Sequence, residues 1–244
     1  MPESTFNFKQ FIINQDKSAM KVSTDSVLLG AWAKADNTVQ RVLDIGSGTG
    51  ILSLMLAQKT DAEITALEID IPSYLQSLEN FAISKWKDRL HAINKSLQEF
   101  ALSTSQTFDI IISNPPFFAD ASPAPDEARN IARHLDETLS LADLANGVKK
   151  LLAPNGKFYV IFPYREAIKF YETALRKDLF CNCVTRIKTR PQKLEKRILM
   201  QFSHILTPIN ESQLTLASAD NVMTEDYKQL TIDYYLDSPD SANV

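Results

Sequence analysis

The sequence predicts an α/β protein built on a doubly wound, mostly parallel β-sheet. Apolar runs of strand length alternate along the chain with longer segments of helical periodicity, and this alternation is typical of such sheets. The segment Phe108 to Ser113, FDIIIS, is apolar on both faces, as a buried parallel strand should be. The stretch Arg41 to Gly50, RVLDIGSGTG, joins an apolar run to closely spaced glycines. Because such sheets bind ligands at the carboxyl ends of their strands, both segments end where a site is expected.

The glycine loop predicts a cofactor site. Gly46, Gly48 and Gly50 are three of the six glycines in the whole chain. Glycine allows a positive φ and lets a ligand lie against bare backbone amides. Residues 51–58 are predicted to form a helix whose first amides point back at that ligand. The spacing differs from the dinucleotide fingerprint GxGxxG, because Asp44 precedes the loop and the third glycine comes one place early. An ordinary strand-to-helix turn is the weaker interpretation, since it does not need three glycines.

The elements around this loop can be predicted in chain order. Either Thr24 or Asp25 can cap a helix that runs through Ala33. The aromatic residues near the N-terminus suit either packing on the core or contact with a ligand, without a preference between them. After the loop, residues 63–67 form a second strand that ends at Glu68. An acidic residue about 20 positions past a glycine-rich turn suits hydrogen bonds to both hydroxyls of a ribose, whereas the alternative is a solvated carboxylate.

The second half of the chain continues the alternation and ends antiparallel. Helices are expected over 71–88, from Asp136 or Thr138 to Leu152, and over 165–176, and strands over 90–93, 108–113 and 157–162. Residues 119–136 indicate a long loop. Residues 181–188 and 197–205 predict a hairpin that closes the sheet. We expect a single domain over 1–236, with 1–40 as an extension that covers the cofactor and 237–244 as a flexible tail.

The sequence Asn-Pro-Pro-Phe after the strand at 108–113 predicts a site for an amino group. Asn114 offers an amide oxygen and Pro115 a backbone carbonyl, and the rigid pair Pro115–Pro116 holds these two acceptors in place. Two acceptors suit a flat –NH₂ group, which has two hydrogens to donate. Phe117 supplies a face on which an extruded base can stack. A plain Asn-Pro turn with an aromatic plug is the alternative. In this fold the strands before the two loops are neighbours, so both loops are expected to open into one crevice.

Together these motifs resemble those of a known enzyme family. DIGSGTG with NPPF resembles the class I S-adenosylmethionine-dependent methyltransferases that act on exocyclic amino groups. FNFKQF, Gln15, MKVSTDSVLLGAWA, RPQKLEKRILMQF and YKQLTIDYYL are similar to segments of the bacterial tRNA(Val) adenine-N6 methyltransferases. The resemblance covers nearly the whole chain. It implies a Rossmann-like class I methyltransferase sheet, S-adenosylmethionine as cofactor, and methylation of the adenosine immediately 3′ of the anticodon, position 37 of tRNA(Val).

The resemblance also assigns residues to roles. It implies that the catalytic site consists of Asn114, Pro115, Pro116 and Phe117. It implies cofactor contacts from Thr24, Asp25, Asp44, Gly46, Gly48, Gly50, Glu68, Ser96 and Asn114. Thr24 and Asp25 would lie near the methionine end. Ser96 stands where many relatives have an aspartate near the cofactor adenine, so this contact would be neutral and weaker.

A basic stripe late in the chain suits a nucleic-acid partner. The span 186–197 contains six Lys and Arg residues and faces only Glu195 within its own sequence. We expect RNA contacts from Arg190, Lys193, Lys196 and Arg197. Phosphate contacts of this kind position an RNA without reading its sequence. The alternative is a solvated hairpin, which the sequence favours equally.

Composition narrows the classes of protein to which this chain can belong. The 244 residues carry a net charge of −4, and the longest apolar runs are shorter than a membrane span. The two cysteines are too few for a metal site, and no secretory signal is visible. We therefore expect a cytoplasmic monomer with no metal and no membrane partner. The open alternatives are an rRNA guanine-N2, DNA adenine-N6 or protein-glutamine methyltransferase, and a non-catalytic RNA-binding protein with a cofactor fold. A nucleotide-dependent oxidoreductase fits the glycine spacing least.

Overall fold

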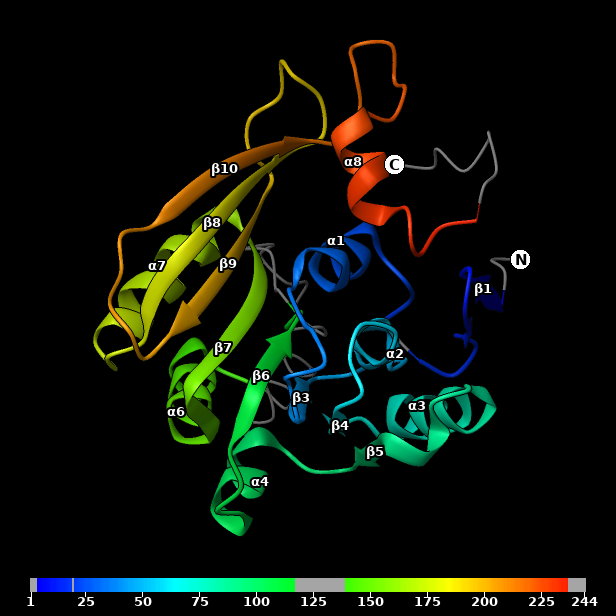
Figure 1. Ribbon diagram of the computed structural model, residues 1–244, viewed down its shortest axis with the longest axis vertical. Coiled ribbons are helices and arrows are strands. Elements are labelled where there is room, and N and C mark those ends of the chain that lie inside the picture. The colour runs from blue at the N-terminus through cyan, green and yellow to red at the C-terminus, as the bar shows by residue number, and fades with distance from the viewer. Residues whose placement is uncertain (1–3, 19, 117–138, 237–244) are drawn as a thin grey trace, which may run out of the picture.

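The structure is a computed structural model that describes residues 4–18, 20–116 and 139–236. Its centre is an eight-stranded sheet in the order β10-β8-β9-β7-β6-β3-β4-β5 (Figure 1). The strands are β3 (Arg41–Ile45), β4 (Glu63–Leu67), β5 (Leu90–Ile93), β6 (Phe108–Ser113), β7 (Leu152–Pro163), β8 (Phe180–Lys188), β9 (Arg197–Ser203) and β10 (Asn210–Thr215). The first five are parallel, and β9 runs antiparallel between β7 and β8. The predicted mostly parallel sheet with an antiparallel C-terminal hairpin is confirmed.

The strand order reverses between β3 and β6. From β3 the chain proceeds outward through β4 and β5, then returns to place β6 on the other side of β3. Ile45 at the end of β3 pairs with Ser113 at the end of β6. The glycine loop and the Asn-Pro-Pro turn therefore begin side by side, as the sequence predicted.

Helices cover both faces of the sheet. They are α1 (Thr24–Trp32), α2 (Ile51–Ala57), α3 (Ile71–Ile83), α4 (Leu97–Ser103), α6 (Leu141–Leu151), α7 (Tyr164–Leu175) and α8 (Glu225–Thr231), with a 3₁₀ turn η1 (Lys87–Arg89). Alternate residues of β6 belong to different cores: Ile110 and Ile112 pack in the cluster with α1 and α2, and Ile111 packs in the cluster with α4, α6 and α7. This two-sided burial explains why the segment is apolar throughout. No helix in the described ranges is long and apolar enough to cross a membrane.

The N-terminal aromatic residues pack on the core. They belong to or follow the antiparallel pair β1 (Thr5–Asn7) and β2 (Ile12–Asn14). Phe8 and Phe11 are 4% and 6% exposed, and their rings stack 4.6 Å apart. Phe8 also stacks on Tyr235 from the far end of the chain. Of the two interpretations left open by the sequence, core packing is correct for Phe8 and Phe11.

Several predicted boundaries and caps were wrong. Ser23, not Thr24 or Asp25, caps α1, and its hydroxyl accepts from the Ser26 amide. Helix α3 ends at Ile83 because the chain becomes extended at Ser84. Helix α6 begins only at Leu141, after a serine cap at residue 140. The predicted loop at 119–136 and tail at 237–244 lie outside the described residues.

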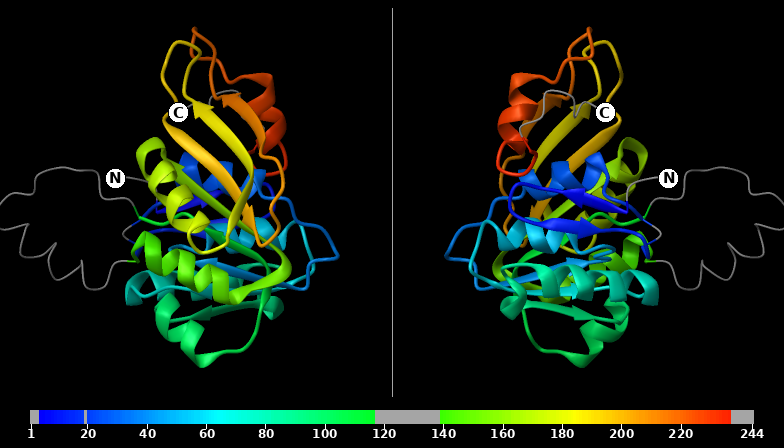
Figure 2. Two further views of the ribbon diagram at one scale, coloured as in Figure 1. Left: turned by 90° about the vertical axis from the view of Figure 1, so that its left-hand side faces the viewer. Right: turned by 90° about the vertical axis from the view of Figure 1, so that its right-hand side faces the viewer.

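Three described elements were not predicted: α4, β10 and α8. Helix α4 carried a readable signal, since Ser96 and Glu99 form a reciprocal capping box at its start. Strand β10 is mostly exposed and polar, so it lacks the alternation that marks a strand. Figure 2 shows β8, β9, β10 and α8 gathered at one end of the molecule, away from β4, β5 and α3. The late elements thus extend the sheet beyond the part that holds the glycine loop.

Candidate active site

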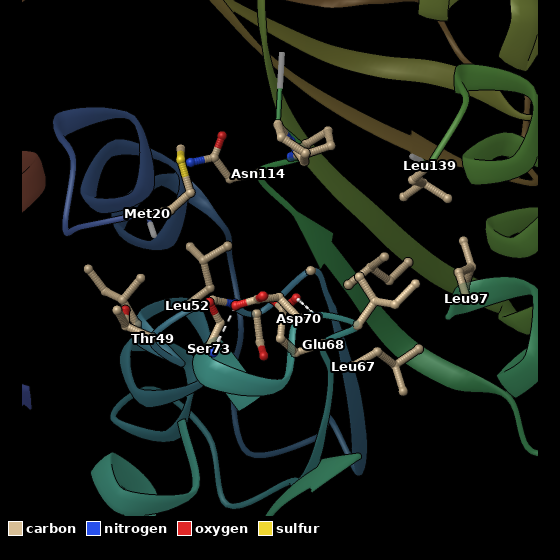
Figure 3. A pocket seen from close by; sticks show the side chains of 18 of the residues that line it. Met20, Thr49, Leu52, Leu67, Glu68, Asp70, Ser73, Leu97, Asn114 and Leu139 are labelled. Atoms are coloured by element: carbon tan, nitrogen blue, oxygen red, sulfur yellow. Dashed lines mark hydrogen bonds between the residues drawn. The ribbon is translucent and has the colours of Figure 1, made fainter. Parts of the chain in front are cut away.

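A cavity of about 670 Å³ opens at the carboxyl ends of β3, β4 and β6. Its volume lies in the range of about 300–1,000 Å³ that small-molecule sites occupy. Figure 3 shows side chains entering it from the segment before α1, the glycine loop, the end of β4, the start of α4 and the turn after β6. Among the predicted site residues, the cavity is lined by Gly46, Gly48, Glu68, Ser96, Asn114, Pro115 and Pro116. The structure therefore brings together residues that are up to 70 positions apart in the sequence (46 to 116).

The glycine loop has the shape of a ligand cradle. Gly46 and Gly48 have φ values of +70° and +54°, and no atom lies within 4 Å of where a Cβ would stand at either position. The amides of Gly46 and Ser47 both donate to the Leu67 carbonyl at 2.9 Å, which fixes the loop to the end of β4. Ser47 lines the cavity, and its hydroxyl is buried and has no hydrogen-bond partner among the described residues. A polar ligand lying against the loop would fit these features.

Gly50, the third glycine of the loop, lies against α3. It does not line the cavity, and a Cβ there would stand 2.5 Å from the Phe81 ring. With φ at +83°, it stands at the start of α2 and allows the backbone there to approach the Phe81 ring of α3. Gly50 thus shapes the loop on the side away from the cavity, and its predicted cofactor contact stays a prediction.

Glu68 is held in the cavity wall by the backbone around it. Its side chain is 8% exposed, its Oε2 accepts from the Gly48 amide at 2.8 Å, and its Oε1 accepts from the Asp70 amide at 2.9 Å. Burial raises the pKa of this carboxyl, and the two backbone hydrogen bonds oppose that rise. Each oxygen retains acceptor capacity for a further donor. A pair of vicinal hydroxyls is a suitable partner for this carboxylate.

Asn114 presents an amide to the same cavity. Ser113 Oγ donates to the Ile45 carbonyl at 2.9 Å, so the end of β6 is tied directly to the end of β3. Asn114 Nδ2 donates to Ser26 Oγ at 3.0 Å, and Asn114 Oδ1 accepts no hydrogen bond that involves only described residues. Pro115 and Pro116 continue the cavity wall. Phe117, the predicted stacking residue, lies outside the described residues.

Asp44 and Ser96 both stabilise helix starts. Asp44 is fully buried, and its Oδ2 accepts from the Ser53 amide at 3.1 Å and from the Ser53 hydroxyl at 2.7 Å. It therefore holds the first turn of α2 and does not line the cavity. Ser96 does line it, but its hydroxyl donates to Glu99 at 2.8 Å and accepts from the Glu99 amide. A remaining lone pair leaves Ser96 able to accept from an adenine amino group, which stays a prediction.

Thr24 and Asp25 lie beside a second, smaller cavity of about 260 Å³, between α1 and the β8–β9 hairpin. Asp25 Oδ2 accepts from Arg197 Nε at 2.6 Å. Asp25 and Arg197 are therefore paired with each other, while the predicted cofactor contact of Asp25 and the predicted RNA contact of Arg197 stay predictions. The same sequence segment instead supplies Lys21, Ser23 and Ser26 to the larger cavity. The segment KVSTDS contains these three residues, but they were not singled out from the sequence.

The basic stripe is more neutralised than its sequence indicates. Acidic residues from outside the span neutralise part of it, because Glu211 pairs with Arg186 and Asp25 pairs with Arg197. Lys188 pairs with Glu195 at 3.7 Å. Arg190 donates to Asn221 at 2.9 Å. The remaining cations, Lys193 and Lys196, are exposed and form no ion pair with described residues. Within the described ranges, no group of three side chains that could hold a metal is found.

Comparison with known proteins agrees with this geometry. The family model described as "Methyltransferase small domain" matches residues 18–188. A "tRNA1(Val) (adenine(37)-N6)-methyltransferase" of Trichodesmium erythraeum is 42% identical over 239 residues, covering 97% of this chain and 99% of that protein. A protein of the same name from Flavobacterium johnsoniae is 43% identical over 235 residues, covering 95% and 99%.

Solved structures show the same fold at low sequence identity. A predicted O-methyltransferase from Agrobacterium tumefaciens superposes with a TM-score of 0.68 at 14% identity, covering 88% of this chain and all of that one. A ribosomal protein L11 methylase from Lactobacillus delbrueckii subsp. bulgaricus gives a TM-score of 0.55 at 17% identity, covering 78% and 83%. At these identities the likeness concerns the fold alone.

The burial of Asp44 generates a prediction about stability and pH. Burial raises its pKa to about 7, so over the range between its unfolded pKa of about 3.9 and that value the folded state holds a proton that the unfolded state has lost. The contribution of Asp44 to the free energy of unfolding therefore falls as pH rises, by up to about 1.4 kcal/mol per pH unit. Asp44→Asn keeps an oxygen acceptor for Ser53 and removes the titration.

Denaturant unfolding of parent and variant at pH 5, 6, 7 and 8 checks this. The free energy of unfolding of Asp44→Asn, measured relative to that of the parent, should increase from pH 5 to pH 7 and then level off. Two curves that stay parallel across this range would show that the Asp44 carboxyl titrates in the folded protein as it does in the unfolded chain.

Proposed function

Because this chain belongs to the methyltransferase small domain family, and within it to the tRNA1(Val) (adenine(37)-N6)-methyltransferases, we propose that it methylates N6 of adenosine 37 in a valine tRNA, with S-adenosylmethionine as the methyl donor. The observation that carries this proposal is that the glycine loop and the Asn-Pro-Pro turn line one cavity. One loop suits a nucleoside-containing cofactor, and the other suits an amino group.

The residues of the cavity fit that cofactor. When bound, S-adenosylmethionine supplies a methyl group made electrophilic by the positively charged sulfur. The backbone at Gly46 and Gly48, which has free space where a side chain would stand, would lie against it, and Glu68 would accept from its ribose hydroxyls. Ile69 and Ile71, which are 48% and 59% exposed and line the cavity, offer apolar surface for its adenine. Lys21 offers a positive charge to its carboxylate.

The Asn-Pro-Pro turn would act on the adenosine. Asn114 Oδ1 and the Pro115 carbonyl each accept one hydrogen of the N6 amine, which turns the nitrogen lone pair out of conjugation and toward the methyl group. S-adenosylmethionine would supply the methyl group to the lone pair that these two acceptors orient, and the amine would then release a proton to water. No prior deprotonation is needed. Catalysis is therefore mainly alignment and stabilisation of the developing positive charge.

The alternative acceptors differ in what they require. The cavity chemistry alone also suits guanine N2, adenine N6 in DNA, or a glutamine side chain, because each presents an –NH₂ group. Near-complete coverage of relatives named as tRNA methyltransferases favours tRNA. A non-catalytic RNA-binding protein would have no use for acceptors preorganised next to a cofactor cradle. A tRNA substrate is consistent with the expected cytoplasmic location, and a monomer without metal remains our expectation.

The first test is the substitution Asn114→Ala. It removes one of the two amine acceptors and should lower the single-turnover rate of tRNA methylation by about two to three orders of magnitude, as expected for a polar group that acts mainly in the transition state. Affinity for S-adenosylmethionine and for tRNA should change only a few-fold. Asn155→Ala, at an exposed position near the amino end of β7 and outside the residues that line the cavity, is the matched control. Mass spectrometry of the tRNA nucleosides identifies the product as N6-methyladenosine; parent-level transfer by Asn114→Ala would reject the proposed mechanism.

A second test concerns the ribose contact of Glu68. Glu68→Ala should weaken binding of S-adenosylmethionine by about 1–3 kcal/mol, because two hydroxyls lose a charged acceptor. Calorimetry with the natural cofactor and with its 2′,3′-dideoxy analogue separates this contact from a general loosening of the glycine loop. The analogue should bind the parent and the variant equally well. An equal loss for both compounds would show that Glu68 acts only through the loop.

A third test concerns the RNA surface. Lys193→Ala with Lys196→Ala should weaken tRNA binding and lower the slope of log K against log salt by about 1–2, one for each lost phosphate contact. Lys85→Ala with Lys87→Ala removes the same charge at the other end of the molecule and is expected to leave the slope unchanged. If both pairs give the parent's slope, the β8–β9 hairpin does not contact tRNA phosphates.

A further inference from the structure

The amide of Asn114 is oriented by a residue that lies 88 positions earlier. Ser26 Oγ accepts from Asn114 Nδ2 at 3.0 Å, and both residues line the large cavity. Figure 3 shows the nitrogen of Asn114 turned toward the segment that carries Met20, just before α1. Ser26 itself is only 8% exposed, so water competes weakly for this hydrogen bond.

The orientation of this amide determines whether the site can work. A side-chain amide has an acceptor end and a donor end of nearly the same shape, and a half-turn exchanges them. The target amine offers two hydrogens and therefore needs the oxygen end. If the amide turned over, two –NH₂ groups would face each other, and neither would have an acceptor. Binding Nδ2 on the α1 side leaves Oδ1 for the substrate.

A serine hydroxyl can also donate, so its own proton must be directed elsewhere for the orientation to be fixed. Ser26 Oγ lies 3.2 Å from Ser23 Oγ. Ser23 is the cap of α1 and already accepts from the Ser26 amide at 3.3 Å. If Ser26 donates its hydroxyl proton to Ser23, its oxygen is left as an acceptor toward Asn114. The two hydrogen bonds then form a chain with one direction: Asn114 Nδ2 donates to Ser26 Oγ, and Ser26 Oγ donates to Ser23 Oγ.

The position of Ser26 does not depend on its hydroxyl. Near the start of α1, Asp25 is paired with Arg197 on β9 at 2.6 Å. At the end of α1, Lys59 Nζ donates to the carbonyls of Gly30, Ala31 and Ala33 at 2.7–2.9 Å. Because the helix is held at both ends, removing the Ser26 hydroxyl should leave its backbone in place.

We propose that Ser26 is a positioning residue that fixes the amide of Asn114 with its oxygen toward the substrate amine, and that Ser23 sets the direction of the Ser26 hydroxyl. This inference deepens the proposed function and rests on it for its kinetic consequence. The hydrogen bond itself can be tested without any substrate.

Ser26→Ala should lower the single-turnover rate of tRNA methylation about ten- to hundredfold, the range expected when a residue that orients a functional group is removed. The loss should appear in kcat, while binding of S-adenosylmethionine and of tRNA stays within about twofold. Ser26→Thr, which keeps the hydroxyl, should restore most of the rate. Ser103→Ala, which removes an exposed serine hydroxyl bonded to the Phe100 carbonyl outside the cavity, is the matched control.

A double-mutant cycle distinguishes positioning from a general structural effect. With Asn114 already changed to alanine, Ser26→Ala should cause no further loss of rate, because it has no amide left to orient. Additive losses would overturn the inference, and so would a parent-level rate for Ser26→Ala while Asn114→Ala is impaired. That second result would leave the proposed function intact.

Nuclear magnetic resonance gives a readout that does not require activity. The side-chain NH₂ signals of Asn114, assigned by their loss in Asn114→Ala, should shift and exchange faster with water in Ser26→Ala than in the parent, and Ser103→Ala should leave them unchanged. Unaltered signals in Ser26→Ala would show that the hydrogen bond does not hold the amide. This outcome would contradict the inference whether or not the protein methylates tRNA.

Discussion

The parallel pairing of β3 with β6 is the constraint on which the site depends. These strands are not consecutive in the chain, and hydrogen bonds between Val42–Ile45 and Ile110–Ser113 hold their carboxyl ends in register. Each strand ends in a loop with unusual chemistry, so the pairing places both loops in one crevice. The core reinforces this register, because a slip of one residue would exchange the side chains that face the two helical layers.

Helix α1 connects this crevice to the rest of the molecule. Its first turn contacts Asn114 through Ser26, and Asp25 on the same turn pairs with Arg197 of the late hairpin. Its last carbonyls are held by Lys59, whose burial lowers its pKa to about 8. The helix thus joins the Asn-Pro-Pro turn, the side of the sheet that carries the glycine loop, and the surface where we expect RNA. A shift of α1 would therefore displace residues at all three places.

Polar residues in this protein often have partners that their sequence neighbours do not indicate. Asp44, next to the glycine loop, accepts a hydrogen bond from the Ser53 amide in the first turn of α2, and Ser96 caps α4 at the cavity edge. Arg186 and Arg197 look like free cations in the sequence but are neutralised by Glu211 and Asp25. The charge that the basic stripe offers a nucleic acid is therefore smaller than its sequence suggests, and among the described residues it remains on Arg190, Lys193 and Lys196.

The sequence by itself determined the α/β class, the main strands, the positive-φ glycines and the two loops that carry the chemistry. These features are local: a run of apolar residues, a glycine spacing or a proline pair constrains the backbone wherever it is placed. Only the tertiary structure decided that Asp25 binds Arg197, that Gly50 packs on Phe81 and that Ser26 holds Asn114. Such pairings depend on which elements meet in space, and a side chain that can serve either a ligand or a neighbouring element looks the same in the sequence.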